Sequence, residues 1–310
     1  MLYSRLTLCY ESIGATSKRL EITALLVELL RETPTSIIDK VVYLTQGKLY
    51  PDYLGIEVGI ADKLTIKSLA TVTGVSENKI TTQYKAKGDL GTATEELLAK
   101  RPQTTLGKER LTVEEVYTGL DRIAQASGQG SVDSKIRQLT GLIAKSSPVE
   151  AKYLVRTALG RLRLGVADMT ILDATAQAFG GGRESRGPLE RAYNRSSDLG
   201  LLARRAATGG MNWIETISIV VGVPVRPMLA ERLPDADSIL KKMHGSAAAE
   251  YKYDGLRIQA HITPKGVSLF SRRLENVTNQ FPDVQQFLRK GVDAKEAVLE
   301  GEAVPIDKST

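Results

Sequence analysis

The first two-thirds of the chain carries apolar residues at the spacing of amphipathic helices. One stripe recurs at i, i+3, i+4 and i+7 and consists of Ile22, Leu25, Leu26 and Leu29. Thr33-Pro34 combines a residue type favoured at helix N-caps with proline at the first helical position, and it predicts a helix that runs through Val42. We assign these apolar positions to a core.

Two capping boxes predict further helices. In each, a Ser or Thr precedes a Glu by three residues, and the helical pattern that follows stops at a glycine. The pairs are Thr112 with Glu115 and Ser147 with Glu150, and the stops are Gly128 and Gly160. A start signal, a helical period and a stop signal therefore agree at both places.

The last third of the chain changes to the period of strands. Residues 256–262 alternate between apolar side chains and Arg257, Gln259 and His261, as in a half-buried strand. Residues 263–266 have turn chemistry and residues 267–271 are extended again, so we expect a hairpin. A further strand is expected at residues 298–304.

The two patterns meet at a proline-punctuated segment, Val223-Pro224-Val225-Arg226-Pro227. We therefore predict a multidomain protein with an all-α domain at 1–222 and an α+β domain with an antiparallel sheet at 223–310. Residues 235–244 are expected to form one helix of the second domain.

Composition limits the class of protein but does not choose a function. The chain has 310 residues, of which 42% are hydrophobic and 25% charged, enough for two cores. The single cysteine, Cys9, excludes an internal disulfide framework, and Cys and His are too scarce for a zinc site. The net charge of +6 has the sign that suits nucleic acid, without deciding the matter. With neither a signal peptide nor a long apolar run, we expect a cytoplasmic protein without a membrane partner.

The stretch from Glu250 to Arg257 contains the candidate nucleophile, Lys252. If residues 247–253 form a strand, Glu250 and Lys252 share a face about 7 Å apart. A nucleophilic lysine needs its charged form disfavoured, and we expect Tyr251 and Tyr253 to contribute burial and Arg257 a nearby positive charge. The alternative is an ordinary exposed strand in which Lys252 is merely solvated.

Two carboxylates follow at Glu300 and Glu302, again on one face of an expected strand. Paired carboxylates suit a divalent metal ion or a ribose hydroxyl.

Three motifs, KYDGLR, SRRLEN and VLEGEAV, occur in this order and contain these residues. The series resembles the covalent nucleotidyltransferases, most closely the ATP-dependent DNA ligases of the archaeal and eukaryotic replicative type. The resemblance implies that a lysine attacks the α-phosphate of ATP and carries AMP. AMP then passes to the 5′-phosphate at a nick in duplex DNA, and the 3′-hydroxyl displaces it, as in replication, repair and recombination.

The resemblance also implies a role for each matching residue. Lys252 corresponds to the adenylated lysine and Glu250 to the residue that contacts adenine. Arg257 and Arg272 correspond to arginines that contact the sugar and phosphate of the nucleotide. Glu302 corresponds to an acid associated with the ribose and the metal, Mg²⁺ or another divalent ion. Glu300 stands where the family more often has Asp, and it is a second metal candidate.

Short glycine-containing loops of the helical region resemble those of the DNA-binding domain in the same ligases. The candidates for phosphate contact with nicked double-stranded DNA are Gly88, Gly91, Gly130, Ser131, Arg161, Arg163 and Gly165. Backbone N–H groups at such loops can bind phosphate, although each loop alone is equally a plain helix end and turn. The arginine-rich stretch at 183–205 is equally open to DNA contact and to a solvated helix face.

Some family features are missing from the sequence. Clamp-binding ligases often have a glutamine followed by aromatic residues, whereas Gln103-Thr104-Thr105-Leu106 has none, which does not favour a sliding clamp as partner. The chain stops at Thr310, before the rest of the adenylation domain and the OB-fold domain, so we expect a truncated, monomeric piece that binds DNA but has weak adenylation of its own or none. An RNA ligase or capping-type nucleotidyltransferase and a non-enzymatic DNA-binding module remain as alternatives.

Overall fold

The computed structural model describes residues 1–100 and 110–306 and divides into two compact units. The first unit comprises Met1–Tyr193 and Asp198–Ile217, and the second comprises Asn194–Ser197 and Ser218–Thr310. Among the described residues, no helix is both long and apolar enough to cross a bilayer. Each unit is considered by itself below.

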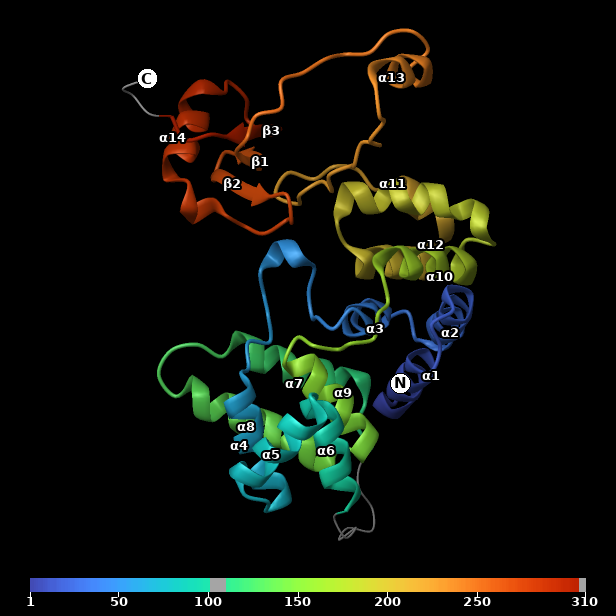
Figure 1. Cartoon of the computed structure of the whole chain (residues 1–310), viewed down its shortest axis with the longest axis vertical. Coiled ribbons are helices and arrows are strands. Elements are labelled where there is room, and N and C mark those ends of the chain that lie inside the picture. Colours follow the sequence, from blue (N-terminus) through green and yellow to red (C-terminus); the bar gives the residue numbers. More distant parts are fainter. Residues whose placement is uncertain (101–109, 307–310) are drawn as a thin grey trace. The chain divides into compact units, whose positions relative to one another are not determined.

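The first unit consists of helices (Figure 1). They are α1 (Tyr3–Gly14), α2 (Arg19–Glu32), α3 (Ile38–Thr45), α4 (Asp62–Thr73), α5 (Glu77–Lys87), α6 (Leu90–Ala99), α7 (Val113–Gln125), α8 (Ser131–Lys145), α9 (Pro148–Ala158), α10 (Asp168–Phe179), α11 (Arg186–Ser196) and α12 (Leu199–Glu215), with 3₁₀ turns at Asp52–Leu54 and Arg183–Ser185. Helix α12 is interrupted at Gly210, whose φ of +64° is outside the helical region.

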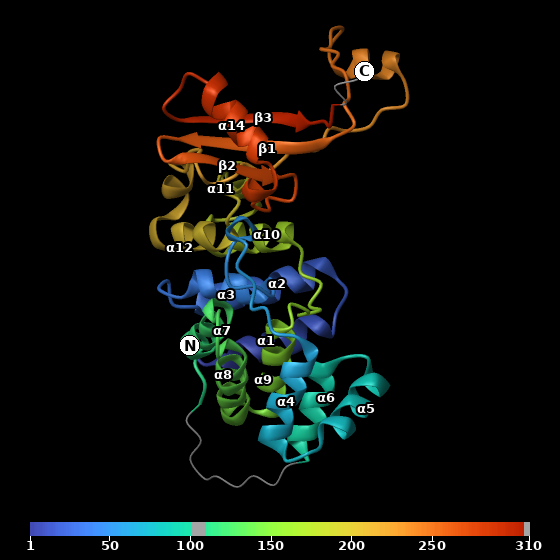
Figure 2. The same cartoon turned by 90° about the vertical axis from the view of Figure 1, so that its left-hand side faces the viewer.

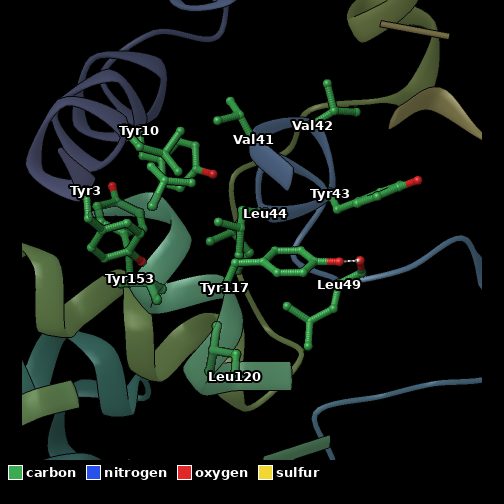
Figure 3. Packing of buried hydrophobic residues seen from close by; sticks show 14 of the residues in the cluster. Tyr3, Tyr10, Val41, Val42, Tyr43, Leu44, Leu49, Tyr117, Leu120 and Tyr153 are labelled. Carbon is green, nitrogen blue, oxygen red and sulfur yellow. Dashed lines mark hydrogen bonds between the residues drawn. The ribbon is translucent and has the colours of Figure 1, made fainter. Parts of the chain in front are cut away.

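The helices of this unit enclose one connected apolar core that contains several tyrosines (Figure 3). Tyr10 and Tyr153 meet edge to face with ring centroids 5.1 Å apart. The hydroxyl of Tyr10 lies 3.3 Å from Thr45 Oγ1, and that of Tyr117 donates to the carbonyl of Leu49. Each buried ring therefore contributes apolar area while its polar end keeps a partner.

The capping boxes predicted from sequence are confirmed, and one helix start is wrong. Thr112 with Glu115 and Ser147 with Glu150 form reciprocal hydrogen bonds at the starts of α7 and α9. Thr33, however, does not start the next helix, because its hydroxyl donates to Leu29 O at the end of α2. The chain turns once more, and α3 begins only at Ile38.

The second unit is a three-stranded antiparallel sheet with helix α14 on one face, shown in Figure 2. The strands are β1 (Leu256–Thr263), β2 (Gly266–Ser271) and β3 (Ala297–Ala303) in the order β2-β1-β3, and the helices are α13 (Ala236–Lys242), α14 (Pro282–Gly291) and a 3₁₀ turn at Thr278–Gln280. Val284 and Leu288 of α14 pack against the buried apolar cluster of the sheet, which includes Ile258 and Leu269. The expected all-α part followed by an α+β part with an antiparallel sheet is confirmed.

The segment before β1 differs from its prediction. Residues 247–253 were expected to form a strand, but they pair with no strand in the described chain. Tyr251 is 88% exposed and Tyr253 63% exposed, so the expected burial by these rings is wrong for this structure. Within the described residues the sheet consists of β2, β1 and β3, and no further strand pairs with this segment or covers its rings.

Candidate functional site

The register of the sheet gathers polar side chains on the face opposite α14. Ile258, Ala260 and Ile262 of β1 point toward the apolar core, so the alternating positions point the other way. On that other face, Arg257 lies opposite Glu302, and Gln259 lies opposite Glu300. The two carboxylates predicted to share a face with each other also share it with Arg257.

Glu300 is held at both of its oxygens. Arg257 Nη2 forms an ion pair with Glu300 Oε2. Gln259 Nε2 donates to Glu300 Oε1 over 2.9 Å. Hydrogen bonds to a carboxylate are stronger than those between neutral groups, so this triad fixes the Glu300 side chain.

Arg272 reaches the same region from the turn that follows β2. Ser271 N donates to Glu275 O over 2.9 Å, and Leu274, with φ of +67°, closes the turn. Arg272 is exposed at its outer side. A small hollow of about 10 Å³, room for about one water molecule, is lined by Val225, Pro227, Arg257, Gln259, Ser271, Arg272, Leu274 and Glu300. Three predicted site residues therefore meet at one place.

Lys252 and Glu250 lie in the exposed segment that leads into β1 and are not among the residues of this hollow. Gly255 connects that segment to the sheet. A Cβ atom at Gly255 would lie 2.5 Å from Ala303 O, so only glycine permits this approach to the end of β3. The structure thus places the candidate nucleophile three residues before Gly255 and five residues before Arg257, which lies opposite Glu302.

The carboxylates fit a metal ion unequally. The Glu302 side chain is exposed and makes no hydrogen bond or ion pair within the described chain, whereas both carboxylate oxygens of Glu300 are engaged. No cluster of three or more His, Cys, Asp or Glu residues suited to a metal occurs in residues 1–100 and 110–306. Mg²⁺ is often held by one or two carboxylates together with substrate phosphates, and Glu302 fits that mode.

Two residues on this face were not selected from the sequence. Alternation placed Gln259 and His261 on the solvent side of β1, but they are 6% and 0% exposed. Residues 222–225 cover them. Val225 N donates to Gln259 Oε1 over 2.7 Å, and Gly222 N donates to His261 Nδ1 over 2.8 Å. The sequence signal for these two positions was that Gln259 and His261 are neutral polar residues on the same face of β1 as the charged Arg257.

The DNA-contact candidates occupy the ends of helices in the first unit. Gly88 ends α5 with φ of +68°, Gly130 precedes α8 with φ of +79°, and Ser131 is the first residue of α8. Gly165 has φ of +70°, and Arg163 has φ of +55°, a conformation that non-glycine residues seldom adopt. Strained backbone of this kind often marks functional positions.

Asp89 joins two of these loops. Its carboxylate caps α6 through Thr92 N, accepts from Arg156 Nε and Nη2, and lies 4.0 Å from Arg163 Nη1. At Gly91 a Cβ atom would lie 2.7 Å from Arg156 Cγ, so glycine lets α6 approach α9 closely. The loops at 88–91 and 160–165 are therefore joined through the carboxylate of Asp89.

Residues 59–62 connect the start of α8 to the loop at 160–165. Arg161 Nη1 lies 3.4 Å from Asp62 Oδ1 at the start of α4 and 3.3 Å from the hydroxyl of Tyr84. Lys135, in the first turns of α8, donates to Gly59 O over 3.3 Å. Residues 59–62 thus link the first turns of α8 to the loop at 160–165.

The other basic candidates are less informative. The stretch at 183–205 lies on α11 and α12, where Arg186 pairs with Asp173 and Arg204 with Asp39. These ion pairs show that part of the stretch serves the fold. Gln103-Thr104-Thr105-Leu106, the segment considered for a sliding clamp, lies outside the described residues.

Comparison with known proteins gives matches along nearly the whole chain. The family model described as "DNA ligase N terminus" matches residues 2–176, and that described as "ATP dependent DNA ligase domain" matches residues 227–310. A protein named DNA ligase 2 from Thermofilum pendens is 48% identical over 315 residues, covering 99% of this chain and 52% of that relative. Proteins named DNA ligase from Saccharolobus shibatae and Saccharolobus solfataricus are each 47% identical over 306 residues, covering 96% of this chain and 51% of each relative.

The chain thus combines a helical ligase N-terminal domain with residues of an adenylation domain. It belongs to the ATP-dependent DNA ligase family. The chain spans about half the length of the curated relatives it matches.

Proposed function

We propose that the protein containing this chain is an ATP-dependent DNA ligase that seals nicks in duplex DNA during replication, repair and recombination. The observation that carries the proposal is the meeting of Arg257, Arg272 and Glu300 at one hollow of the sheet, with Arg257 five residues after Lys252 in the KYDGLR motif. Basic and acidic groups fixed on one face are what binding of a nucleotide requires.

In this proposal Lys252 is the residue that forms a bond to the α-phosphorus of ATP, and pyrophosphate leaves. Arg257 and Arg272 contact the sugar and phosphates, where their positive charge offsets the charge that gathers on the phosphate oxygens. Glu250 contacts the adenine. Because Lys252 is exposed in the described structure, the proposal requires that nucleotide binding brings this segment against the polar sheet face.

A divalent metal ion, when bound, neutralises phosphate charge and orients the transferring group. Glu302 would hold it together with the phosphates of the nucleotide. Glu300 is proposed as a second ligand only if its bonds to Arg257 and Gln259 are exchanged for the metal.

The loops of the helical unit are proposed to bind the sugar-phosphate backbone of DNA. The candidates Gly88, Gly91, Gly130, Ser131 and Gly165 offer backbone N–H groups close to helix ends, and Arg161 and Arg163 offer exposed positive charge. Contact with phosphate is independent of base sequence, which suits a protein that must act on any nick.

Labelling with nucleotides tests the proposal. The protein is incubated with labelled ATP, GTP or NAD, and acid-labile label on the protein is measured. Label from ATP that falls at least about a thousandfold in Lys252→Ala supports the ligase assignment, since removal of a covalent nucleophile abolishes its route. Lys265→Ala is the matched control, because Lys265 is an exposed lysine in the β1–β2 turn, and it should label normally.

The other outcomes identify the alternatives. Label from GTP in place of ATP would indicate a capping-type enzyme. An absence of label from every nucleotide, with DNA binding retained, would contradict adenylation and leave a DNA-binding module.

A further inference from the structure

Residues 222–225 are fastened to the sheet by side chains of β1, chiefly that of Gln259. Val225 N donates to Gln259 Oε1 over 2.7 Å, and Gln259 Nε2 donates back to Val225 O over 3.1 Å. The amide of Gln259 thus pairs with the backbone of Val225 as a neighbouring strand would. Val225 and Pro227 also line the hollow that contains Arg257, Arg272 and Glu300, so this fastening holds one wall of the hollow.

His261 sets the orientation of that amide. Gly222 N donates to His261 Nδ1 over 2.8 Å, so Nδ1 is the acceptor and the ring proton is on Nε2. Nε2 lies 2.9 Å from Gln259 Oε1 and donates to it. The ring is fully buried and meets Phe270 edge to face, with centroids 5.1 Å apart, which restricts its rotation.

With this orientation every polar atom of the Gln259 amide is satisfied. Oε1 accepts from Val225 N and from His261, while the two protons of Nε2 go to Val225 O and Glu300 Oε1. A flipped amide would set its oxygen against the Glu300 carboxylate and its protons against two other donors. Only one orientation is therefore compatible with the surroundings.

We propose that Gln259 is a positioning residue for nucleotide binding: it ties the seating of residues 222–225 to the placement of Glu300 and Arg257, and His261 selects its orientation. This inference rests on the proposed function, because Arg257 and Glu300 are taken to serve the nucleotide. Gln259 acts through these side chains and is not itself assigned contact with ATP. A purely structural role would affect stability without a selective effect on ATP binding.

A pair of substitutions at His261 separates the two roles. In His261→Gln, an amide nitrogen can occupy the place of Nε2 and donate to Gln259, whereas His261→Asn is too short to reach it and retains only an acceptor for Gly222. We expect the KM for ATP in protein labelling to rise about tenfold in His261→Asn and less than about threefold in His261→Gln, with similar kcat. Equal KM values in the two variants would overturn the orienting role.

Substitution of Gln259 tests the positioning role itself. Gln259→Glu keeps the shape but removes the donor to Glu300 and adds a second carboxylate beside it, so the KM for ATP should rise more than tenfold. Gln259→Met removes the hydrogen bonds without adding charge and should give a smaller rise. A KM unchanged in both folded variants would contradict the proposal, and thermal unfolding monitors whether they are folded.

A structural measurement distinguishes failure of this inference from failure of the proposed function. Hydrogen exchange of the Val225 amide, followed by NMR, should be slow in the wild type and at least about tenfold faster in Gln259→Met. If the Val225 amide exchanges slowly but the wild-type protein takes up no label from ATP, the ligase function is overturned. The role of Gln259 in ATP binding then falls with it, although residues 222–225 remain fastened to the sheet. Fast exchange in wild-type protein that still labels Lys252 would overturn the inference alone.

Discussion

Tyrosines lie in opposite surroundings in the two units. In the helical unit Tyr3 and Tyr10 are each 1% exposed and belong to the core, whereas Tyr251 and Tyr253 of the second unit are mostly exposed and contact mainly each other. The helical unit surrounds its apolar residues with helices on all sides. The second unit has its apolar cluster on one face of its sheet, and the opposite face carries charged and polar groups together with the buried ring of Phe270. In the helical unit these tyrosines serve the core, whereas the second unit presents polar groups that a ligand can reach.

The two units also differ in whether the charged side chains of their candidate sites have partners. Asp89, Arg156 and Arg163 of the helical unit are tied to one another, so their placement is part of the fold. The side chains of Lys252, Arg272 and Glu302 of the second unit make no hydrogen bond or ion pair to any residue that the structure describes. We infer that the helical unit presents a preformed surface, while the second unit presents groups that gain partners on binding.

The largest expected effect concerns the core. Leu120→Ala, at a fully buried position of α7, should lower the free energy of unfolding of the helical unit by about 2–5 kcal/mol because it removes apolar contacts and leaves a cavity. Tyr251→Ala should change stability by less than about 0.5 kcal/mol. Urea denaturation measures both. A loss above about 2 kcal/mol for Tyr251→Ala would mean that this ring is buried in solution.

A smaller effect is expected at the carboxylate that joins two loops. Asp89→Ala should cost about 2 kcal/mol, since it removes the cap of α6 and leaves the half-buried Arg156 without its partner. Asp89→Asn retains an acceptor for the cap and should cost less. Equal losses in the two variants, measured by thermal unfolding, would show that the cap hydrogen bond is unimportant and that the loss comes from the missing charge.

The pH dependence of Asp89 follows from its partners. Burial opposes ionisation, but the hydrogen bonds from Arg156 and Thr92 outweigh it and hold the pKa of Asp89 below its ordinary value. The stabilisation by this carboxylate is therefore complete above the ordinary pKa of Asp and is lost as the pH falls through the lowered pKa. The Asp89→Ala variant should lack this part of the acid dependence.

A moderate effect is expected on DNA affinity. Arg163→Ala should weaken binding of duplex DNA about three- to tenfold at all sequences and reduce the salt dependence by about one phosphate contact. Lys18→Ala, which removes one exposed charge from the segment before α2, is the control and should change little. Fluorescence anisotropy at several salt concentrations gives both quantities, and equal losses in the two variants would argue against a defined phosphate contact.

The smallest effect concerns His261. Burial lowers the pKa of His261, so the folded protein resists protonation more than the unfolded chain does. Stability should be greatest above the ordinary pKa of histidine and should fall as the pH drops from there toward the lowered value. The groups around the ring are the Gly222 backbone, Gln259 and Phe270, with Ser268 and Val298 beside it in the sheet register, and no charged group among them causes the shift.

This dependence is measured as unfolding free energy between about pH 7 and 5. His261→Gln cannot titrate in this range and should flatten the curve. A wild-type curve of the same shape as that of His261→Gln would show that the ring does not remain neutral in the folded protein.

Local signals predicted local structure well. The capping boxes at Thr112 and Ser147 lie within four residues of the groups they satisfy, and both were found. The helix start predicted at Thr33 was wrong because the Thr33 hydroxyl donates to Leu29 O, one turn earlier, and does not cap a new helix. The polar alternation that placed Glu300 and Glu302 on one face needed only the period of a strand.

Features that depend on distant residues could not be read from the sequence. The burial of Gln259 and His261 is produced by residues 222–225, more than thirty positions earlier. The expected burial of Lys252 by Tyr251 and Tyr253 failed for the same kind of reason, since a side chain is buried by the elements packed on it and not by its neighbours in sequence. The roles of the site residues therefore remain predictions from the motifs.

The most direct test of the ligase account is to locate the AMP group. The protein is incubated with ATP and a divalent metal ion, digested at neutral or alkaline pH, which preserves a phosphoramidate, and sequenced by mass spectrometry. The account predicts one AMP adduct, on the side chain of Lys252. An adduct on another residue, or none while nicked DNA is still sealed, would contradict it.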